Sequence, residues 1–127
     1  MVNKLGKPFV GQNKKGKATK ELLKSMLFSH IPPAPFEIPL RVQIMFRFPM
    51  RKNEKKALRD REAIPCDKRP DCDNLAKGLL DAMQGDFFLD DAQIYDLKIT
   101  KLYAQRTGIG VTIKAIDQTS LGHFPLY

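Results

Sequence analysis

The chain has 127 residues, which is enough for one domain with one sizeable core. Hydrophobic residues make up 43% and charged residues 28%, a balance typical of a soluble globular protein rather than a disordered chain. No apolar run approaches the roughly 20 residues that a membrane span needs, and the N-terminus lacks the apolar stretch of a secretion signal. We therefore expect no membrane segment and a cytoplasmic location.

The net charge of +8 is distributed unevenly along the chain. Residues 1–56 contain 13 Lys/Arg and 3 Asp/Glu, whereas 8 of the 14 acidic residues lie between Asp67 and Asp96. A basic body is typical of proteins that bind polyanions such as nucleic acids. Carboxylates concentrated in one region repel one another unless a cation neutralises them, so the acidic region indicates a separate feature.

The first part of the chain predicts a helix and a strand. Residues 1–17 carry lysines with little apolar content and are interpreted as a basic, partly mobile arm. Residues 18–30 predict an amphipathic helix, whose apolar face contains Leu22, Leu23, Met26 and Leu27. Prolines end this helix. Residues 36–48 alternate apolar and polar side chains, which predicts a half-buried strand.

The next part is highly charged before regular structure resumes. Residues 49–69 are predicted to form an exposed basic loop, with a short helix near residues 53–61. A second amphipathic helix is predicted over residues 75–83, where apolar residues recur at helical spacing. Two strands follow, over residues 93–103 and 109–116.

The connection between the last two strands completes the predicted topology. Residues 105–108 are interpreted as a hairpin turn that pairs these strands in antiparallel fashion. The element order is then α-β-α-β-β. The expected fold class is α+β: a single small domain over residues 1–127, with helices packed on a mixed or antiparallel sheet.

Two short acidic segments contain the candidate catalytic residues. Asp71 and Asp73 lie where an irregular segment turns into the second helix, with Lys77 one helical turn later. Asp90 and Asp91 directly precede the next strand. A short helix and a tight turn would return the start of that strand beside the beginning of the helix. We therefore expect the carboxylates and the lysine around a single point.

Each of these aspartates also has a structural explanation. An aspartate at a helix start caps free N–H groups and complements the helix dipole, and Asp73 with Lys77 is an ordinary i,i+4 pair. Capping explains one or two aspartates, but not four in a chain of charge +8. Clustered carboxylates without cysteine or histidine partners suit Mg²⁺, which prefers oxygen ligands and retains waters. Since Mg²⁺ beside a phosphodiester activates water, the pattern predicts a magnesium-dependent nuclease.

These segments resemble the signature of the RusA family of Holliday junction resolvases. The matching residues are Asp71, Asp73, Asn74, Lys77, Asp90, Asp91 and Gln93. The resemblance implies a RusA-like fold and a small homodimeric endonuclease, dependent on Mg²⁺ with Mn²⁺ as a substitute. Such enzymes cut four-way DNA junctions by paired symmetric cleavage in recombination and repair, and they are encoded by bacteria or prophages.

The resemblance also assigns roles to particular residues. The family's catalytic, metal-binding carboxylates fall on Asp71, Asp73 and Asp91, and its catalytic lysine falls on Lys77. Asn74 and Asp90 are interpreted as supporting residues of the site. Contacts to DNA phosphates are expected from Lys14, Lys15, Lys17, Lys68 and Arg69.

Two alternatives remain open. Pro70-Asp71 with the later Asp96 and Lys98 matches the short pattern of the PD-(D/E)xK nucleases, but this assignment leaves Asp91 without a role. The second alternative is a non-catalytic basic DNA-binding protein, in which the carboxylates are caps and surface groups. No helix-turn-helix or zinc-finger pattern favours it.

Overall fold

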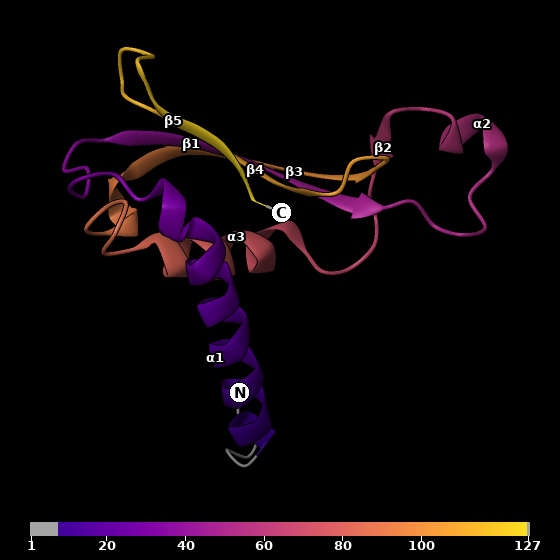
Figure 1. Ribbon diagram of the computed structural model, residues 1–127, viewed down its shortest axis with the longest axis horizontal. Coiled ribbons are helices and arrows are strands. Elements are labelled where there is room, and N and C mark those ends of the chain that lie inside the picture. Colours follow the sequence, from indigo (N-terminus) through magenta and orange to yellow (C-terminus); the bar gives the residue numbers. More distant parts are fainter. Residues whose placement is uncertain (1–7, 127) are drawn as a thin grey trace.

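The structure is a computed structural model that describes the backbone of residues 8–126 and the side chains of residues 18–126. Within these residues, three α-helices and a five-stranded sheet make up the fold (Figure 1). In chain order the elements are α1 (Pro8–Leu27), the 3-10 helix η1 (Phe28–His30), β1 (Leu40–Pro49), α2 (Lys56–Arg59), β2 (Ala63–Pro65), α3 (Cys72–Met83), the 3-10 helix η2 (Asp91–Gln93), β3 (Ile94–Ala104), β4 (Gly108–Lys114) and β5 (Ser120–Leu126).

The five strands form one mixed sheet in the order β2-β3-β1-β4-β5. The central strand, β1, pairs in parallel with β3 and antiparallel with β4. The expected hairpin between β3 and β4 is therefore wrong, because β1 lies between them and residues 105–107 cross over its end. β5 pairs with β4 and is a strand that the sequence pattern does not predict. The expected α+β class with a mixed sheet is confirmed.

The core lies between the sheet and the two longer helices, which cover the same side of it (Figure 1). Alternate residues of β1 are buried in this core: Leu40, Val42, Ile44 and Phe46. α3 contributes a stripe at helical spacing that includes Leu79 and Met83. Phe87 and Phe88 follow α3 and are 1% and 0% exposed, so they are core residues. Their burial fixes the turn after α3 against the sheet.

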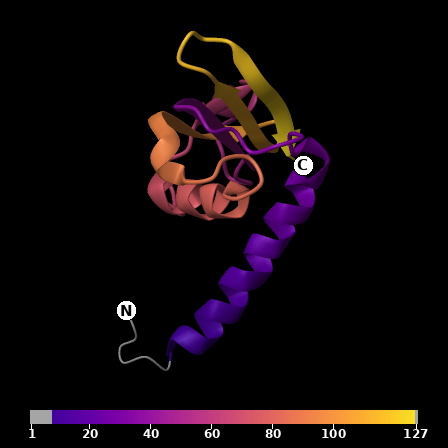
Figure 2. The ribbon, with the colours of Figure 1, turned by 90° about the vertical axis from the view of Figure 1, so that its left-hand side faces the viewer.

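α1 extends as an arm away from the rest of the fold (Figures 1 and 2). Among the residues whose side chains are described, the C-terminal part of α1 reaches the core through the buried Leu27 and the half-buried Leu23 and Met26. Although α1 has 20 residues, no helix in the described part of the chain is long and apolar enough to cross a membrane.

The helix begins earlier than its apolar pattern predicts. Of the basic, partly mobile arm expected over residues 1–17, residues 8–17 continue α1, while residues 1–7 lie outside the described residues. Extending an existing helix adds one hydrogen bond for each residue fixed, so the anchored C-terminal part can support a polar extension. Pro8 suits the first turn, because its missing N–H would have no intrahelical partner there.

The charged segment 49–69, expected as an exposed loop with a short helix, is mostly exposed and contains regular structure. It contains α2, inside the range predicted for a short helix, and the unpredicted β2, which pairs with the end of β3. Arg51 Nε and Nη2 donate to Glu54 at 3.0 and 2.8 Å, and the Arg51 guanidinium lies 4.8 Å from the centroid of the Tyr103 ring. Gln105 Nε2 donates to two carbonyls of the segment. These contacts attach this segment, the charged lobe, to the end of β3.

Candidate active site

The first acidic pair lies at the N-terminus of α3. Asp71 is the N-cap residue, and its carbonyl accepts the N–H of Leu75 at 3.0 Å, but its carboxylate makes no capping hydrogen bond. Asp73 follows in the first turn. Asp71, Asp73 and Lys77 are all exposed, and none of them forms a salt bridge within the described residues. The Asp71 carboxylate therefore does not cap the helix. The ordinary i,i+4 ion pair between Asp73 and Lys77 is not formed either.

Polar and basic groups surround Asp71. A shallow surface depression is lined by Arg69, Pro70, Asp71 and Asn74. This places Asn74, predicted to support the site, and Arg69, predicted to contact DNA, beside the Asp71 carboxylate. Lys68 is also exposed in the segment that leads into α3. A phosphate that approaches Asp71 would therefore meet positive charge on the same surface.

The second acidic pair lies in the turn before β3. The Asp90 carboxylate accepts the N–H of Ala92 at 2.9 Å, while the side chain of Gln93 accepts the N–H of Asp90 at 3.0 Å. These two bonds form a capping box for η2, so the structural explanation holds for Asp90. Asp91 is exposed and forms no salt bridge within the described residues.

Gln93 fixes this turn and connects it to the segment before β1. Its side-chain oxygen accepts the N–H groups of Leu89 and Asp90 at 2.8 and 3.0 Å. Its amide donates to the carbonyls of Phe36 and Ile38 at 2.8 and 3.1 Å. Sequence reasoning assigns no role to Gln93, although the spacing from Asp90 to Gln93 is that of a capping box and could have identified it.

The two acidic pairs lie at opposite ends of α3. The 12 residues of this helix extend for about 18 Å, and the chain reverses direction after it, so β3 begins beside the end of the helix. The other end of α3 lies beside Lys101, whose Nζ donates to the carbonyl of Pro70 at 2.8 Å. Lys101 is near the end of β3, far along the strand from Asp91.

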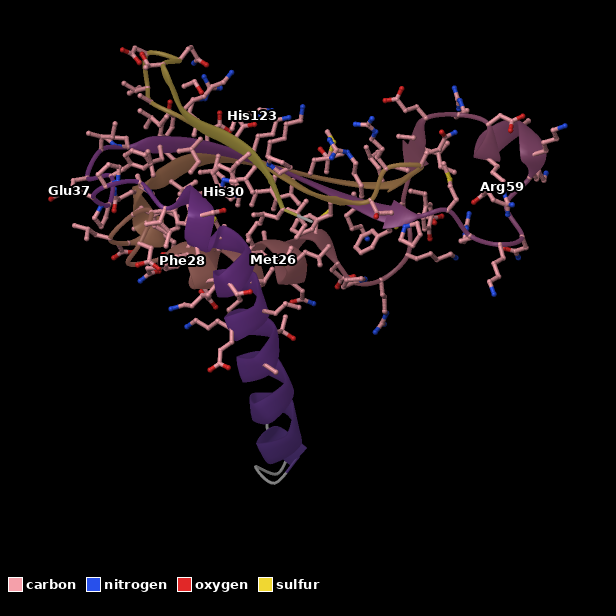
Figure 3. All side chains as sticks on the ribbon, in the orientation of Figure 1. Met26, Phe28, His30, Glu37, Arg59 and His123 are labelled. Carbon is pink, nitrogen blue, oxygen red and sulfur yellow. The ribbon has the colours of Figure 1, made fainter. Side chains whose placement is uncertain are left out.

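In Figure 1, α3 lies lengthwise along the sheet, so the segments at its two ends are separated by the length of the helix. Glu37, between the two carbonyls that Gln93 binds, marks the end of the molecule at which α3 finishes (Figure 3). The expectation that the carboxylates of both acidic pairs lie around a single point is therefore wrong within one chain. Among the described residues, no three His, Cys, Asp or Glu side chains are grouped so that they could hold a metal ion.

The pair at the start of α3 nevertheless suits a hard cation. Asp71, Asp73 and the side-chain carbonyl of Asn74 are oxygen donors close together in sequence on an exposed helix end. Mg²⁺ is usually held through one or two carboxylates, several waters and substrate phosphates, rather than in an all-protein cage. Two carboxylates here match that requirement, and Asp91 of the same chain is too far away to be a third ligand.

Asp96, which the alternative nuclease pattern uses, faces the other side of the sheet. Its carboxylate binds Arg41, with Nη2 at 2.8 Å and Nε at 3.0 Å. A bulge in β3 places Ile94 against the core, whereas Asp96 and Lys98 line a shallow pocket on the opposite face. Because the sheet separates Asp96 from Asp71, the geometry does not support the PD-(D/E)xK alternative.

The expected DNA contacts on the N-terminal arm are only partly described. Lys14, Lys15 and Lys17 belong to α1, but their side chains lie outside the described residues. The helix that carries them extends away from the sheet, as Figure 2 shows. Their role in binding therefore remains a prediction.

Exposed carboxylates beside Arg69, on a basic α+β protein, are the kind of surface that a nuclease requires, and the family comparison defines the class. Residues 2–114 match the family described as Endodeoxyribonuclease RusA, and the chain belongs to that family. The uncharacterized protein YqaN of Bacillus subtilis (strain 168) is 27% identical over 117 residues, which cover 88% of this chain and 82% of that protein. Membership makes the protein an endodeoxyribonuclease, an enzyme that hydrolyses phosphodiester bonds within DNA.

Proposed function

We propose that the protein is a Mg²⁺-dependent resolvase that cuts four-way DNA junctions by paired, symmetric cleavage in recombination and repair. Mn²⁺ would be able to replace Mg²⁺. One observation carries the proposal beyond the family match: the Asp71 carboxylate stands at the N-cap of α3 without capping it. Asp73, two residues later, is exposed as well. Two carboxylates without a structural task suit a cation-binding role.

The residues at the start of α3 would have different roles in hydrolysis. Asp71 and Asp73 would hold the metal through carboxylate oxygens, with Asn74 in support. When bound, Mg²⁺ supplies activation of the attacking water and neutralises charge on the phosphate oxygens. Lys77, one turn farther along α3, would donate to the phosphate and stabilise its developing negative charge. Arg69 would hold a phosphate beside the metal site.

A second copy of the chain would supply Asp91. Symmetric cutting of a four-way junction requires two sites related by a two-fold axis, which a C₂ dimer provides. In such a dimer, the partner subunit's Asp91 would complete the site that begins with Asp71 and Asp73. This arrangement gives Asp91 a role that its position in one chain does not allow.

The edge of β3 is the surface that favours this dimer. β2 pairs only with Leu102–Ala104, and Cys66 after it bonds to the Lys101 carbonyl, so in the described fold the edge over residues 94–100 has no strand beside it on that side. Tyr95 and Leu97 on this edge are 51% and 39% exposed, and exposed apolar side chains on an open edge favour association. Two such edges placed antiparallel across a two-fold axis would bring the start of one β3 toward Lys101 of the other.

The test is cleavage of a synthetic four-way junction against a linear duplex of the same sequence, with and without Mg²⁺. The proposal predicts paired nicks in the junction, dependence on Mg²⁺ or Mn²⁺, and little cutting of the duplex. Asp71→Asn should bind the junction without cutting it. Tight junction binding by the original protein with no cleavage at any metal concentration would instead favour the non-catalytic DNA-binding alternative.

A further inference from the structure

A lysine outside the acidic pairs, Lys101, holds the segment that leads into Asp71. Its Nζ donates to the carbonyls of Lys68 and Pro70, the latter at 2.8 Å. At the other end of the segment, the backbone N–H of Cys66 donates to the Lys101 carbonyl at 3.1 Å. The chain from Cys66 to Pro70 is thus attached to one residue of β3 at three points.

The Lys101 ammonium is used for main-chain carbonyls rather than for a carboxylate. Lys101 is half-buried, and it forms no salt bridge within the described residues. Two carbonyl oxygens that face the same point repel each other unless a donor lies between them, and an ammonium supplies three N–H donors. A neutral, apolar side chain at this position would leave the carbonyls of Lys68 and Pro70 without that donor.

The carbonyl of Pro70 belongs to the peptide group that joins Pro70 to Asp71. Peptide groups are planar, so a fixed carbonyl also fixes the direction in which the chain continues into Asp71. Asp71 has extended backbone angles and Asp73 is already helical. The relative placement of the two carboxylates therefore depends on how the chain enters α3, and Lys101 controls that step.

We propose that Lys101 is a positioning residue for the metal-binding carboxylates, an inference that rests on the proposed function. Lys101 acts through the backbone of Pro70 and contacts neither the metal nor the reacting phosphate. Partners that orient a metal ligand affect metal affinity by about 10- to 100-fold when they are removed. The rate at saturating metal should change much less, because the reacting groups themselves are intact.

The experiment compares Lys101→Met and Lys101→Arg with a matched control, Lys98→Met. Methionine keeps an apolar stem without the donors, and arginine retains donors that can span two carbonyls. Lys98 lies on the same strand but is exposed on the opposite face of the sheet. Two quantities are measured on the full chain: Mn²⁺ binding by electron paramagnetic resonance, and the Mg²⁺ dependence of single-turnover junction cleavage.

Lys101→Met should raise both metal midpoints by about 10-fold or more, and cleavage should recover at saturating Mg²⁺. Lys101→Arg should stay within about threefold of the original protein, and Lys98→Met should be unchanged. If Lys101→Met does not fold, Lys101→Gln replaces it, because the shorter amide cannot reach both carbonyls. An unchanged midpoint in the folded neutral variant overturns the proposal, and so does a rate that stays low at saturating metal.

Asp71→Asn separates this inference from the proposed function. If Asp71→Asn retains the metal affinity of the original protein, the metal site at the start of α3 is wrong, and the role of Lys101 is wrong with it. If Asp71→Asn loses metal while the neutral Lys101 variant does not, the metal site stands and only the positioning role is wrong.

Discussion

Arg41 and Asp96 form an ion pair on the face of the sheet opposite α3, with Arg41 Nη2 2.8 Å from Asp96 Oδ2. The pair joins β1 to β3, which run in parallel next to each other. Asp96 therefore has a structural partner, in contrast to Asp71 and Asp91, whose carboxylates form no salt bridge in the described part of the chain. The acidic region thus contains one carboxylate in an ion pair and others without one. Substitutions of the two kinds should affect DNA cleavage differently.

Asp96→Asn should leave the rate of junction cleavage almost unchanged. Its side chain and that of Arg41 are 46% and 38% exposed, so losing the pair should cost only about 0–1 kcal/mol of folding free energy. Single-turnover cleavage and urea unfolding measure the two effects, with Asp73→Asn as the inactive comparison. An inactive Asp96→Asn beside an active Asp91→Asn would overturn the site assignment and revive the alternative nuclease pattern.

Lys77→Ala should lower turnover much more than junction affinity. Lys77 is exposed one turn after Asp73 without a salt-bridge partner in the described structure, so its charge is available to the phosphate in the transition state. Single-turnover cleavage at saturating enzyme and a binding titration without metal separate the two quantities. Weaker binding with an unchanged cleavage rate would reduce Lys77 to a phosphate anchor.

Gln93→Ala should destabilise the fold and impair the Asp91 turn together. The side chain makes four hydrogen bonds to backbone groups, and their loss should cost about 2–4 kcal/mol of unfolding free energy. Gln84→Ala is the control, because the Gln84 side chain is exposed at the end of α3 and should change stability by about 0.5 kcal/mol or less. Equal urea midpoints for the two variants would contradict the role given to Gln93.

Replacing Lys14, Lys15 and Lys17 together with Gln should weaken junction binding and flatten its salt dependence. Each lost phosphate contact should reduce the slope of log affinity against log salt by about 0.9. A triple substitution of Lys52, Lys55 and Lys56 in the charged lobe removes the same charge from exposed positions and controls for net charge. If the arm variant keeps the original slope, the arm does not contact phosphates.

Much of the central fold could be predicted, because β1 and α3 carry strong periodic patterns of residues that are buried. The pairing of β3 with β4 could not, since proximity in sequence favours a hairpin. β1 instead inserts between them, where its inward-facing Val42, Ile44 and Phe46 are covered from both neighbouring strands. β2 and β5 escape prediction because they are short or interrupted by Gly122 and Pro125, and depend on neighbours for pairing.

The candidate site was only partly predictable for a related reason. Sequence spacing identifies Asp71, Asp73 and Lys77 as exposed residues at the start of a helix, and the structure agrees. Spacing does not reveal where Asp91 lies. Asp91 follows the C-terminal end of α3, whereas Asp71 lies at the N-terminal end of that helix. Lys101 has no sequence signal for its contacts, since the carbonyls that it binds come from a segment 31 and 33 residues away.

The division of the site between two copies is tested most directly by mixing two inactive variants, Asp71→Asn and Asp91→Asn, with different affinity tags. If each site takes Asp71 and Asp73 from one subunit and Asp91 from the other, a mixed dimer has one site with both substitutions and one with neither. Random assortment then restores about a quarter of all sites, and the purified mixed dimer should nick junctions in Mg²⁺. A mixed dimer as inactive as either parent would contradict the account, because a site within one chain would leave each copy damaged.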